Sequence, residues 1–244
     1  MDLHVHTVLS PCAELEMGAA DIVGRCLDEG IDIIAIADHN AAANSVAVIN
    51  AAKDKPLTVL PALEVQSRED IHTLCLFKTV EEAFAFQDWV WARLAPVKND
   101  PDLFGFQLVI DHENNILEEV DTLLLQGIDA SVDDVIEKTK CMGGIAILAH
   151  VDRPAYSYLA VLGMLHPNMN IDAVELSARL TAQEALYWKE SVLDYSIIRS
   201  SDAHRLNDIQ RCHSTPIYLE QPSFNDVFFA LHRYNDRRVK WPWS

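Results

Sequence analysis

The chain of 244 residues contains no apolar run of the roughly 20 residues that a membrane-spanning helix needs. Its first residues, MDLHVHT, lack the basic start and apolar stretch of a signal peptide. The five cysteines are odd in number and scattered, so we do not expect a disulfide scaffold. These absences predict a cytoplasmic protein that makes no contact with a membrane.

Positive charge is also scarce. The sequence has 19 Lys and Arg against 37 Asp and Glu, which gives a formal net charge of −18. Because an acidic surface repels a phosphate backbone, this balance predicts that the protein does not bind duplex nucleic acid.

Several common signatures are missing as well. The sequence has no P-loop, no Gly-rich dinucleotide fingerprint and no Ser-His-Asp set, so it does not predict NTP or serine-nucleophile chemistry. No repeat, low-complexity tract or linker marks a domain boundary. Half of the residues are apolar, enough for one sizeable core, and barrels of about 200–250 residues often form one unit. We therefore expect a single domain over residues 1–244.

The recurring pattern is a short apolar segment followed by a helix-like segment. The predicted strands cover residues 3–6, 32–37, 57–60, 71–77, 145–149, 172–176, 195–199 and 216–219. The helix signals are a segment over 13–29 closed by Gly30, and the capping pairs Ser131 with Asp134, Thr181 with Glu184 and Ser223 with Asp226. This alternation indicates an α/β fold with a parallel sheet, because a crossover helix is the usual return connection.

One segment, at about 78–144, interrupts the alternation. It begins with a predicted helix over 80–94. Two strand-like stretches, 104–110 and 116–120, then flank the polar turn 111–115. We interpret the segment as a helix and a hairpin inserted into the α/β layout, where they could act as a lid.

Histidines and carboxylates gather where predicted strands end. The residues at or just beyond strand ends are His4, His6, Asp38, His39, Glu64, His150, Asp202 and His204. In a parallel barrel the carboxyl ends of the strands share one face, and active sites lie there. His72 opens its strand and fits this arrangement less well.

The spacing of these residues points to metal binding. Residues two apart in a strand project to the same side, so His4 and His6 point together, as do Asp202 and His204 if the strand continues. Imidazole with carboxylate suits zinc, iron or manganese. Each pair alone could also be an ordinary core or surface pair, but together the ligands exceed what one ion can use. The sequence therefore predicts two or three divalent metal ions.

Six short motifs also occur in the order found in a known family: DLHVHT, IADHN, ALEV, HTLCLF, AHVDRP and SSDAH. On these motifs the chain resembles the PHP family, named for polymerase and histidinol phosphatase domains, over most of its length. The resemblance implies a distorted (β/α)7 barrel with a trinuclear metal centre in the cleft at the carboxyl ends of its strands.

The resemblance also distributes the ligands among three metals. They are His4, His6, Glu64 and Asp202 for the first, Glu64, His72 and His150 for the second, and His39 and His204 for the third. The family pattern has one more third-site ligand, and Cys12 stands in its place. Either its thiolate binds zinc or iron, or Cys12 is a small turn residue and the third site is weak or absent.

Clustered divalent ions favour hydrolysis, because they lower the pKa of a shared water and clamp both oxygens of a displacement at phosphorus. We predict a metal-dependent phosphoesterase that acts on a small phosphorylated metabolite or nucleotide. Glu64 and Asp202 are its expected catalytic metal ligands, and Asp38 would orient a ligand histidine or act as general base. The candidates for phosphate contact, each of which could equally be a surface arginine, are Arg153, Arg179 and Arg205.

Three alternative functions stay open. They are hydrolysis of a C–N bond, exonuclease action on single-stranded nucleic-acid ends, and a metal-binding module without catalysis. The acidic composition counts against the exonuclease, and the nearly complete ligand set counts against the module. The sequence does not identify the substrate, the metal or the oligomeric state.

Overall fold

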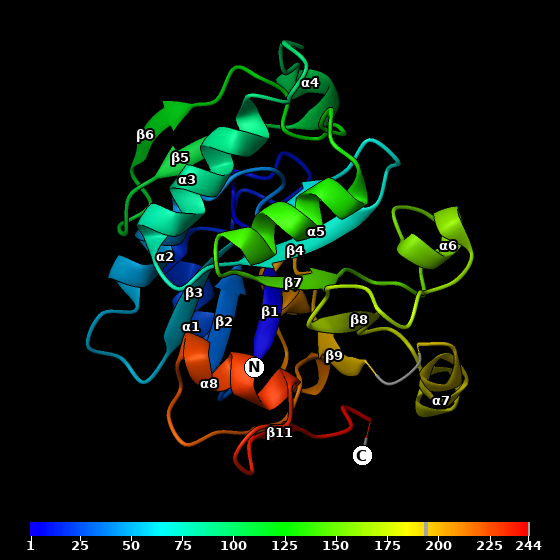
Figure 1. The fold of residues 1–244 in the computed structure, drawn as a ribbon. Coiled ribbons are helices and arrows are strands. Elements are labelled where there is room, and N and C mark those ends of the chain that lie inside the picture. The colour runs from blue at the N-terminus through cyan, green and yellow to red at the C-terminus, as the bar shows by residue number, and fades with distance from the viewer. Residues whose placement is uncertain (193–194, 244) are drawn as a thin grey trace.

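The structure is a computed structural model that describes residues 1–192 and 195–243. A seven-stranded sheet curls into a nearly closed barrel (Figure 1). Its strands, in spatial order, are β1 (Asp2–Val5), β2 (Ile33–Ile36), β3 (Thr58–Gln66), β4 (His72–Leu76), β7 (Ile145–Leu148), β8 (Ala173–Ser177) and β9 (Ser196–Ser200). The barrel closes where Val5 pairs with Ala203, just beyond β9. The predicted (β/α)7-type barrel is therefore confirmed.

One strand runs against the others. β3 and β4 form an antiparallel hairpin in which Glu64 pairs with Leu74, and β4 is also antiparallel to β7. The remaining neighbours in the barrel pair in parallel. The expectation of a wholly parallel sheet is thus wrong at β4. Because β4 is reversed, His72 at its start lies at the same edge as the carboxyl ends of the parallel strands.

Helices cover the outside of the barrel. α1 (Ala19–Asp28) and α2 (Ala43–Ala51) pack on β1 and β2, and α3 (Val80–Trp91) packs on β3 and β4. The helices on the β7 and β8 side are α5 (Val132–Cys141), α6 (Tyr158–Leu162) and α7 (Ala182–Ser191). α8 (Phe224–Leu231) packs its apolar side chains against the barrel interior, at the end where the chain begins (Figure 1).

Local sequence signals explain several helix boundaries. Ser131 and Thr181 form the expected capping boxes of α5 and α7, and the Ser223 side chain caps α8. The helix expected from residue 13 begins only at Ala19. Residues 13–18 are held instead by tertiary contacts, such as the hydrogen bond from Glu14 N to the His204 carbonyl (2.9 Å).

The inserted segment has the predicted helix and hairpin. After α3 come α4 (Pro101–Phe104) and the antiparallel strands β5 (Leu108–Ile110) and β6 (Ile116–Glu119). Leu108 N donates to the Val8 carbonyl (3.0 Å), which attaches the hairpin to the loop after β1. In Figure 1 these elements lie at the opposite end of the barrel from α8, so the insertion covers the end that carries the predicted site.

The last predicted strand lies outside the barrel. Residues 217–218 form β10 (Ile217–Tyr218), which pairs with β11 (Arg238–Val239) in a separate two-stranded sheet. All five cysteines fall within the described residues and are free. None of the helices that the structure describes is long and apolar enough to cross a bilayer.

Candidate metal centre

The predicted ligands meet around the carboxylate of Glu64, which lies in β3 and is 1% exposed. Five histidine rings contact it. Oε1 lies 2.8 Å from Nδ1 of His72, 3.1 Å from Nε2 of His150 and 3.2 Å from Nε2 of His4, and Oε2 lies 3.0 Å from Nδ1 of His39 and 3.4 Å from Nε2 of His6. Residues from four different strand ends therefore share one carboxylate.

Asp202 and His204 join the cluster from the loop after β9. Asp202 Oδ1 lies 3.3 Å from Nε2 of His4 and 3.2 Å from Nε2 of His6. The His204 ring lies 4.2 Å from the His6 ring, and its Nε2 lies 3.1 Å from Cys12 Sγ. All nine predicted metal ligands thus lie in one neighbourhood.

The donor atoms fit metal ions. Four buried ring nitrogens make no hydrogen bond in the described part of the chain: Nε2 of His4 and of His6, which have only the carboxylate contacts of 3.2–3.4 Å given above, Nε2 of His72, and Nδ1 of His150. A buried polar atom without a partner is costly, so each such atom calls for an explanation. Imidazole nitrogens beside carboxylate oxygens are the donor set of zinc, manganese and iron. The described residues form three sets in which all donor atoms of a set lie within 4.8 Å of one another. The sets are His6, His39 and His204; His4, His6, Glu64 and Asp202; and His39, Glu64 and His72.

Asp38 lies beneath the cluster and fixes the orientation of His6. Both Thr7 N and Thr7 Oγ1 donate to its carboxylate (2.7 and 2.8 Å), as does Ser10 Oγ (2.7 Å). Because the Ser10 hydroxyl uses its hydrogen to donate to Asp38, its oxygen accepts from His6 Nδ1 (2.9 Å) and His39 N (3.1 Å). His6 is therefore protonated at Nδ1, and the lone pair of its Nε2 is free for a metal ion.

Glu175 was not predicted from the sequence, yet it orients two ligands. It lies in β8, is 1% exposed, and its Oε1 accepts from His4 Nδ1 (3.0 Å) and from His150 N (3.1 Å). The available signal was a lone carboxylate inside the apolar strand AVELS, where an unpaired charge would be costly. Its role matches the carboxylate that commonly holds the second nitrogen of a metal-binding histidine.

Burial and neighbouring charges favour the metal-binding protonation states of Glu64, His6 and His39. Burial raises the pKa of Glu64, but the neighbouring His72 and His4 hold it well below its ordinary value. Burial and the charge of His204 lower the pKa of His6 to about 4. Burial likewise holds the pKa of His39 well below its ordinary value. At neutral pH the carboxylate is charged and these two imidazoles are neutral, which are the states that bind metal.

His4 behaves differently. Burial lowers its pKa, but the carboxylates of Asp202, Glu175 and Glu64 outweigh that effect and raise it well above the ordinary value. A metal ion at this position must therefore displace a proton, so metal affinity should depend on pH.

A cavity of about 330 Å³ opens onto the cluster. The described residues that line it are His39, Glu64, Gln66, His72, Phe104, Leu125, His150, Arg153, Tyr156, Asp202 and His204. Arg153 reaches into it, with Nη2 2.5 Å from Asp202 Oδ2. Of the other predicted arginines, Arg205 pairs with Glu14 (2.7 Å) and Arg179 is exposed beyond β8; neither is among these described lining residues. Asp38 is not among them either.

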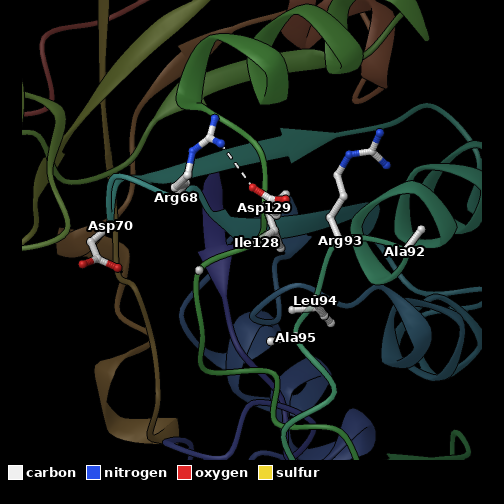
Figure 2. A pocket seen from close by; sticks show the side chains of 9 residues that line it. Arg68, Asp70, Ala92, Arg93, Leu94, Ala95, Ile128 and Asp129 are labelled. Carbon is white, nitrogen blue, oxygen red and sulfur yellow. Dashed lines mark hydrogen bonds and ion pairs between the residues drawn. The ribbon is translucent and has the colours of Figure 1, made fainter.

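A larger hollow of about 610 Å³ lies nearby (Figure 2). Its wall contains Arg68, paired with Asp129 at 3.2 Å, and Arg93. One hydrogen bond links its wall to that of the metal cavity: Gln66, which lines the cavity, donates to Asp70 in this wall (2.8 Å). None of the three donor sets found among the described residues lies here, so the smaller cavity is the candidate site.

Neither a family model nor a curated protein matches the sequence. Solved structures match the fold. Endonuclease Q from Pyrococcus furiosus has a TM-score of 0.69 at 13% identity, over 98% of this chain and 56% of that chain. A complex of endonuclease Q with a 27-mer duplex substrate that has an abasic lesion gives 0.66 at 14% identity, over 98% and 57%. The present chain thus spans little more than half the length of these proteins.

Two further matches are described as phosphoesterases. A metal-dependent phosphoesterase from Bifidobacterium adolescentis has a TM-score of 0.59 at 18% identity and covers 95% of both chains. A two-domain protein from Bacteroides vulgatus with a PHP-like metal-dependent phosphoesterase gives 0.54 at 14% identity, over 98% of this chain and 62% of that one. At these identities the matches establish a shared fold.

The endonuclease Q complex corrects one expectation. A protein of this fold binds a 27-mer DNA duplex, so the exclusion of duplex nucleic acid from the net charge of −18 is wrong. Net charge averages over the whole surface, whereas phosphate contacts depend on local groups. In the wall of the hollow in Figure 2, Arg68 and Arg93 place two cations beside the carboxylates of Asp70 and Asp129, although the chain as a whole is acidic.

Proposed function

We propose that this chain, which has the PHP-type barrel fold of the matched structures, is a metal-dependent phosphoesterase. The main support is the convergence of five histidines on Glu64, with Asp202 beside them, in a cavity that also contains Arg153. Fold alone does not specify chemistry, so this donor set carries the proposal.

The ligand positions suit two or three ions of zinc, manganese or iron. Bound ions would lower the pKa of a water and offset the charge of phosphate oxygens. Glu64, shared by five histidines, would hold neighbouring ions together. Cys12 is exposed, and its Sγ lies 3.1 Å from Nε2 of His204. It would serve as a ligand of the third ion only if that ion replaced the thiol proton.

Among the described residues that line the cavity, Arg153 is the one with a guanidinium or ammonium group. Burial lowers its pKa, but the carboxylates of Asp202 and Glu175 raise it overall, so it stays charged. Its Nε also lies 3.4 Å from Ser177 Oγ, which helps to hold the guanidinium in place. We assign it to phosphate oxygens, because its planar fork can donate two hydrogen bonds to them.

The substrate we propose is a small phosphorylated metabolite or nucleotide, because the cavity volume is at the lower end for small-molecule sites. A second candidate is cleavage of DNA. It is favoured by the fold of endonuclease Q and by the hollow with Arg68 and Arg93, whose wall is hydrogen-bonded to the cavity lining.

The test combines metal analysis with turnover. Protein purified without oxygen is assayed for metal content, then for hydrolysis of phosphomonoesters, a phosphodiester, single-stranded DNA and duplex DNA with an abasic site. Glu64→Gln should lose both bound metal and activity, whereas Glu118→Gln, on the exposed strand β6, should retain both. A metal-loaded protein that hydrolyses none of these esters would refute the proposal, as would full metal retention in Glu64→Gln.

A further inference from the structure

The metal cavity has an apolar part that the metal chemistry does not use. Three lining side chains, Phe104, Leu125 and Tyr156, are outside the candidate donor sets. Phe104 is 37% exposed and Tyr156 is 47% exposed. Two partly exposed aromatic rings in the lining of a charged cavity offer a flat apolar surface to a ligand.

Tyr156 is fixed against the cluster. Its ring stacks on His72, with ring centroids 4.9 Å apart and planes 25° apart. Its carbonyl accepts from His72 N (3.1 Å). Its φ of 56° is in the left-handed region, which a tyrosine adopts only where its surroundings enforce it. The ring is therefore positioned before any ligand arrives.

Phe104 comes from the insertion and is also held in place. Gly105, the next residue, has φ 101° and lies so close to Pro11 that a Cβ atom would be 2.0 Å from the Pro11 carbonyl oxygen. Asn99 Nδ2 donates to the Gly105 carbonyl (2.9 Å). The approach to Pro11 places the backbone next to Phe104 against the loop that carries Cys12, and the Asn99 hydrogen bond fixes that backbone within the insertion.

Leu125 is tied to the metal ligands through Asn40. The Asn40 side chain donates to the carbonyls on either side of Leu125, those of Leu124 (2.8 Å) and Gln126 (2.9 Å). Asn40 directly follows His39 and has φ 52°. The apolar part of the cavity is thus built from three separate segments, each fastened near the cluster.

We propose that Phe104 and Tyr156, with Leu125, bind the nucleobase of a substrate whose phosphate lies at the metal cluster and Arg153. This inference rests on the proposed function and narrows its substrate to nucleotides. A planar base stacks on aromatic side chains, which strengthens binding by roughly five- to hundred-fold per base. The base can belong to a mononucleotide or to an unpaired nucleotide of a nucleic acid.

The experiment compares substrates that differ only in the base. AMP and ribose 5-phosphate present the same phosphomonoester with and without adenine. Metal-loaded protein should show a kcat/KM for AMP at least about ten-fold higher, mainly through KM. Phe104→Ala and Tyr156→Ala should bring this ratio towards one, whereas Tyr156→Phe keeps the ring and the ratio. Phe106→Ala is the matched control, because Phe106 is 47% exposed in the same insertion but is absent from the described cavity lining.

Calorimetric binding of the two ligands gives a second readout, independent of turnover. If nothing is hydrolysed, the proposed function fails, but a preference for AMP that Phe104→Ala abolishes would still support the base site. Equal binding and equal kcat/KM for the two ligands would overturn it. A 5′-phosphorylated oligonucleotide shows whether the base belongs to a mononucleotide or to a nucleic acid. If Phe104→Ala weakens binding of the oligonucleotide but not of AMP, the base is that of a nucleic acid.

Discussion

Replacing Glu175 with Gln should weaken metal binding by about 10- to 100-fold while leaving the fold intact. The side chain touches no predicted metal position directly. It acts through His4, whose Nδ1 it holds at 3.0 Å, and through the backbone of His150. Gln has nearly the same shape, so the substitution mainly removes the negative charge.

The size of the effect follows from these contacts. A hydrogen bond to a charged group contributes about 1.5–3 kcal/mol, and a neutral one about 0.5–1.5 kcal/mol. The difference of about 1–2 kcal/mol corresponds to roughly ten-fold in affinity, and carboxylates behind metal-binding histidines typically contribute 10- to 100-fold. Although Glu175 also raises the pKa of His4, a dication carries twice the charge of the proton it displaces. The loss of attraction therefore affects the metal more than the proton.

The assay is competition with a chelating fluorescent indicator for zinc or manganese at fixed pH. Glu118→Gln removes the same charge from the exposed strand β6 and should bind metal as the wild type does. Thermal unfolding of the metal-free proteins checks that Glu175→Gln is folded. Wild-type affinity in a folded Glu175→Gln protein would refute the idea that Glu175 orients the ligands.

Three other substitutions test the site and its supports. Arg153→Lys keeps the charge but loses the planar fork, so kcat/KM for phosphoesters should fall about ten-fold with unchanged metal content, as steady-state kinetics and metal analysis will show. Gly105→Ala should lower the free energy of unfolding, measured in urea, by about 1–3 kcal/mol. The loss should exceed that of Gly143→Ala, because a Cβ atom at Gly105 would collide with Pro11, whereas a Cβ atom at Gly143 would meet no atom within 4 Å. The pKa of His6 is about 4 in the folded state and about 6.5 unfolded, so the unfolded state binds more protons between these values. The stability that comes from keeping His6 neutral is present above pH 6.5 and is lost as the pH falls towards 4. The melting temperature of chelator-treated protein should therefore fall over this range. An equal fall in the His6→Gln variant would contradict the assignment to His6.

The ligand positions could be predicted from the sequence because they depend on local order. An apolar strand followed by a polar residue places that residue at a known edge of a parallel barrel. This reasoning located His39, His150 and Asp202, which the structure brings together. Glu175 escaped it because a single carboxylate within a strand carries no spacing pattern.

Strand direction could not be predicted in the same way. The alternation of side chains is identical in parallel and antiparallel strands. β4 is antiparallel because residues 67–71 form a tight turn, in which Ser67 N donates to the Ile71 carbonyl (2.9 Å) and Asp70 has φ 61°. The position of His72 at the metal-binding edge therefore depends on this turn, and the residues next to His72 in the sequence do not indicate it.

The seam of the barrel has a consequence for the order of folding. Leu3 N donates to Ser200 Oγ (3.3 Å) across 197 positions of sequence, and His6 N donates to the Ala203 carbonyl. Contacts between such distant residues form slowly, because the intervening chain must first lose its freedom. His4, His6 and Asp202 flank this seam, so the ability to capture an ion should arise only once both ends of the polypeptide have docked. A bound ion would then slow the separation of the two ends of the polypeptide.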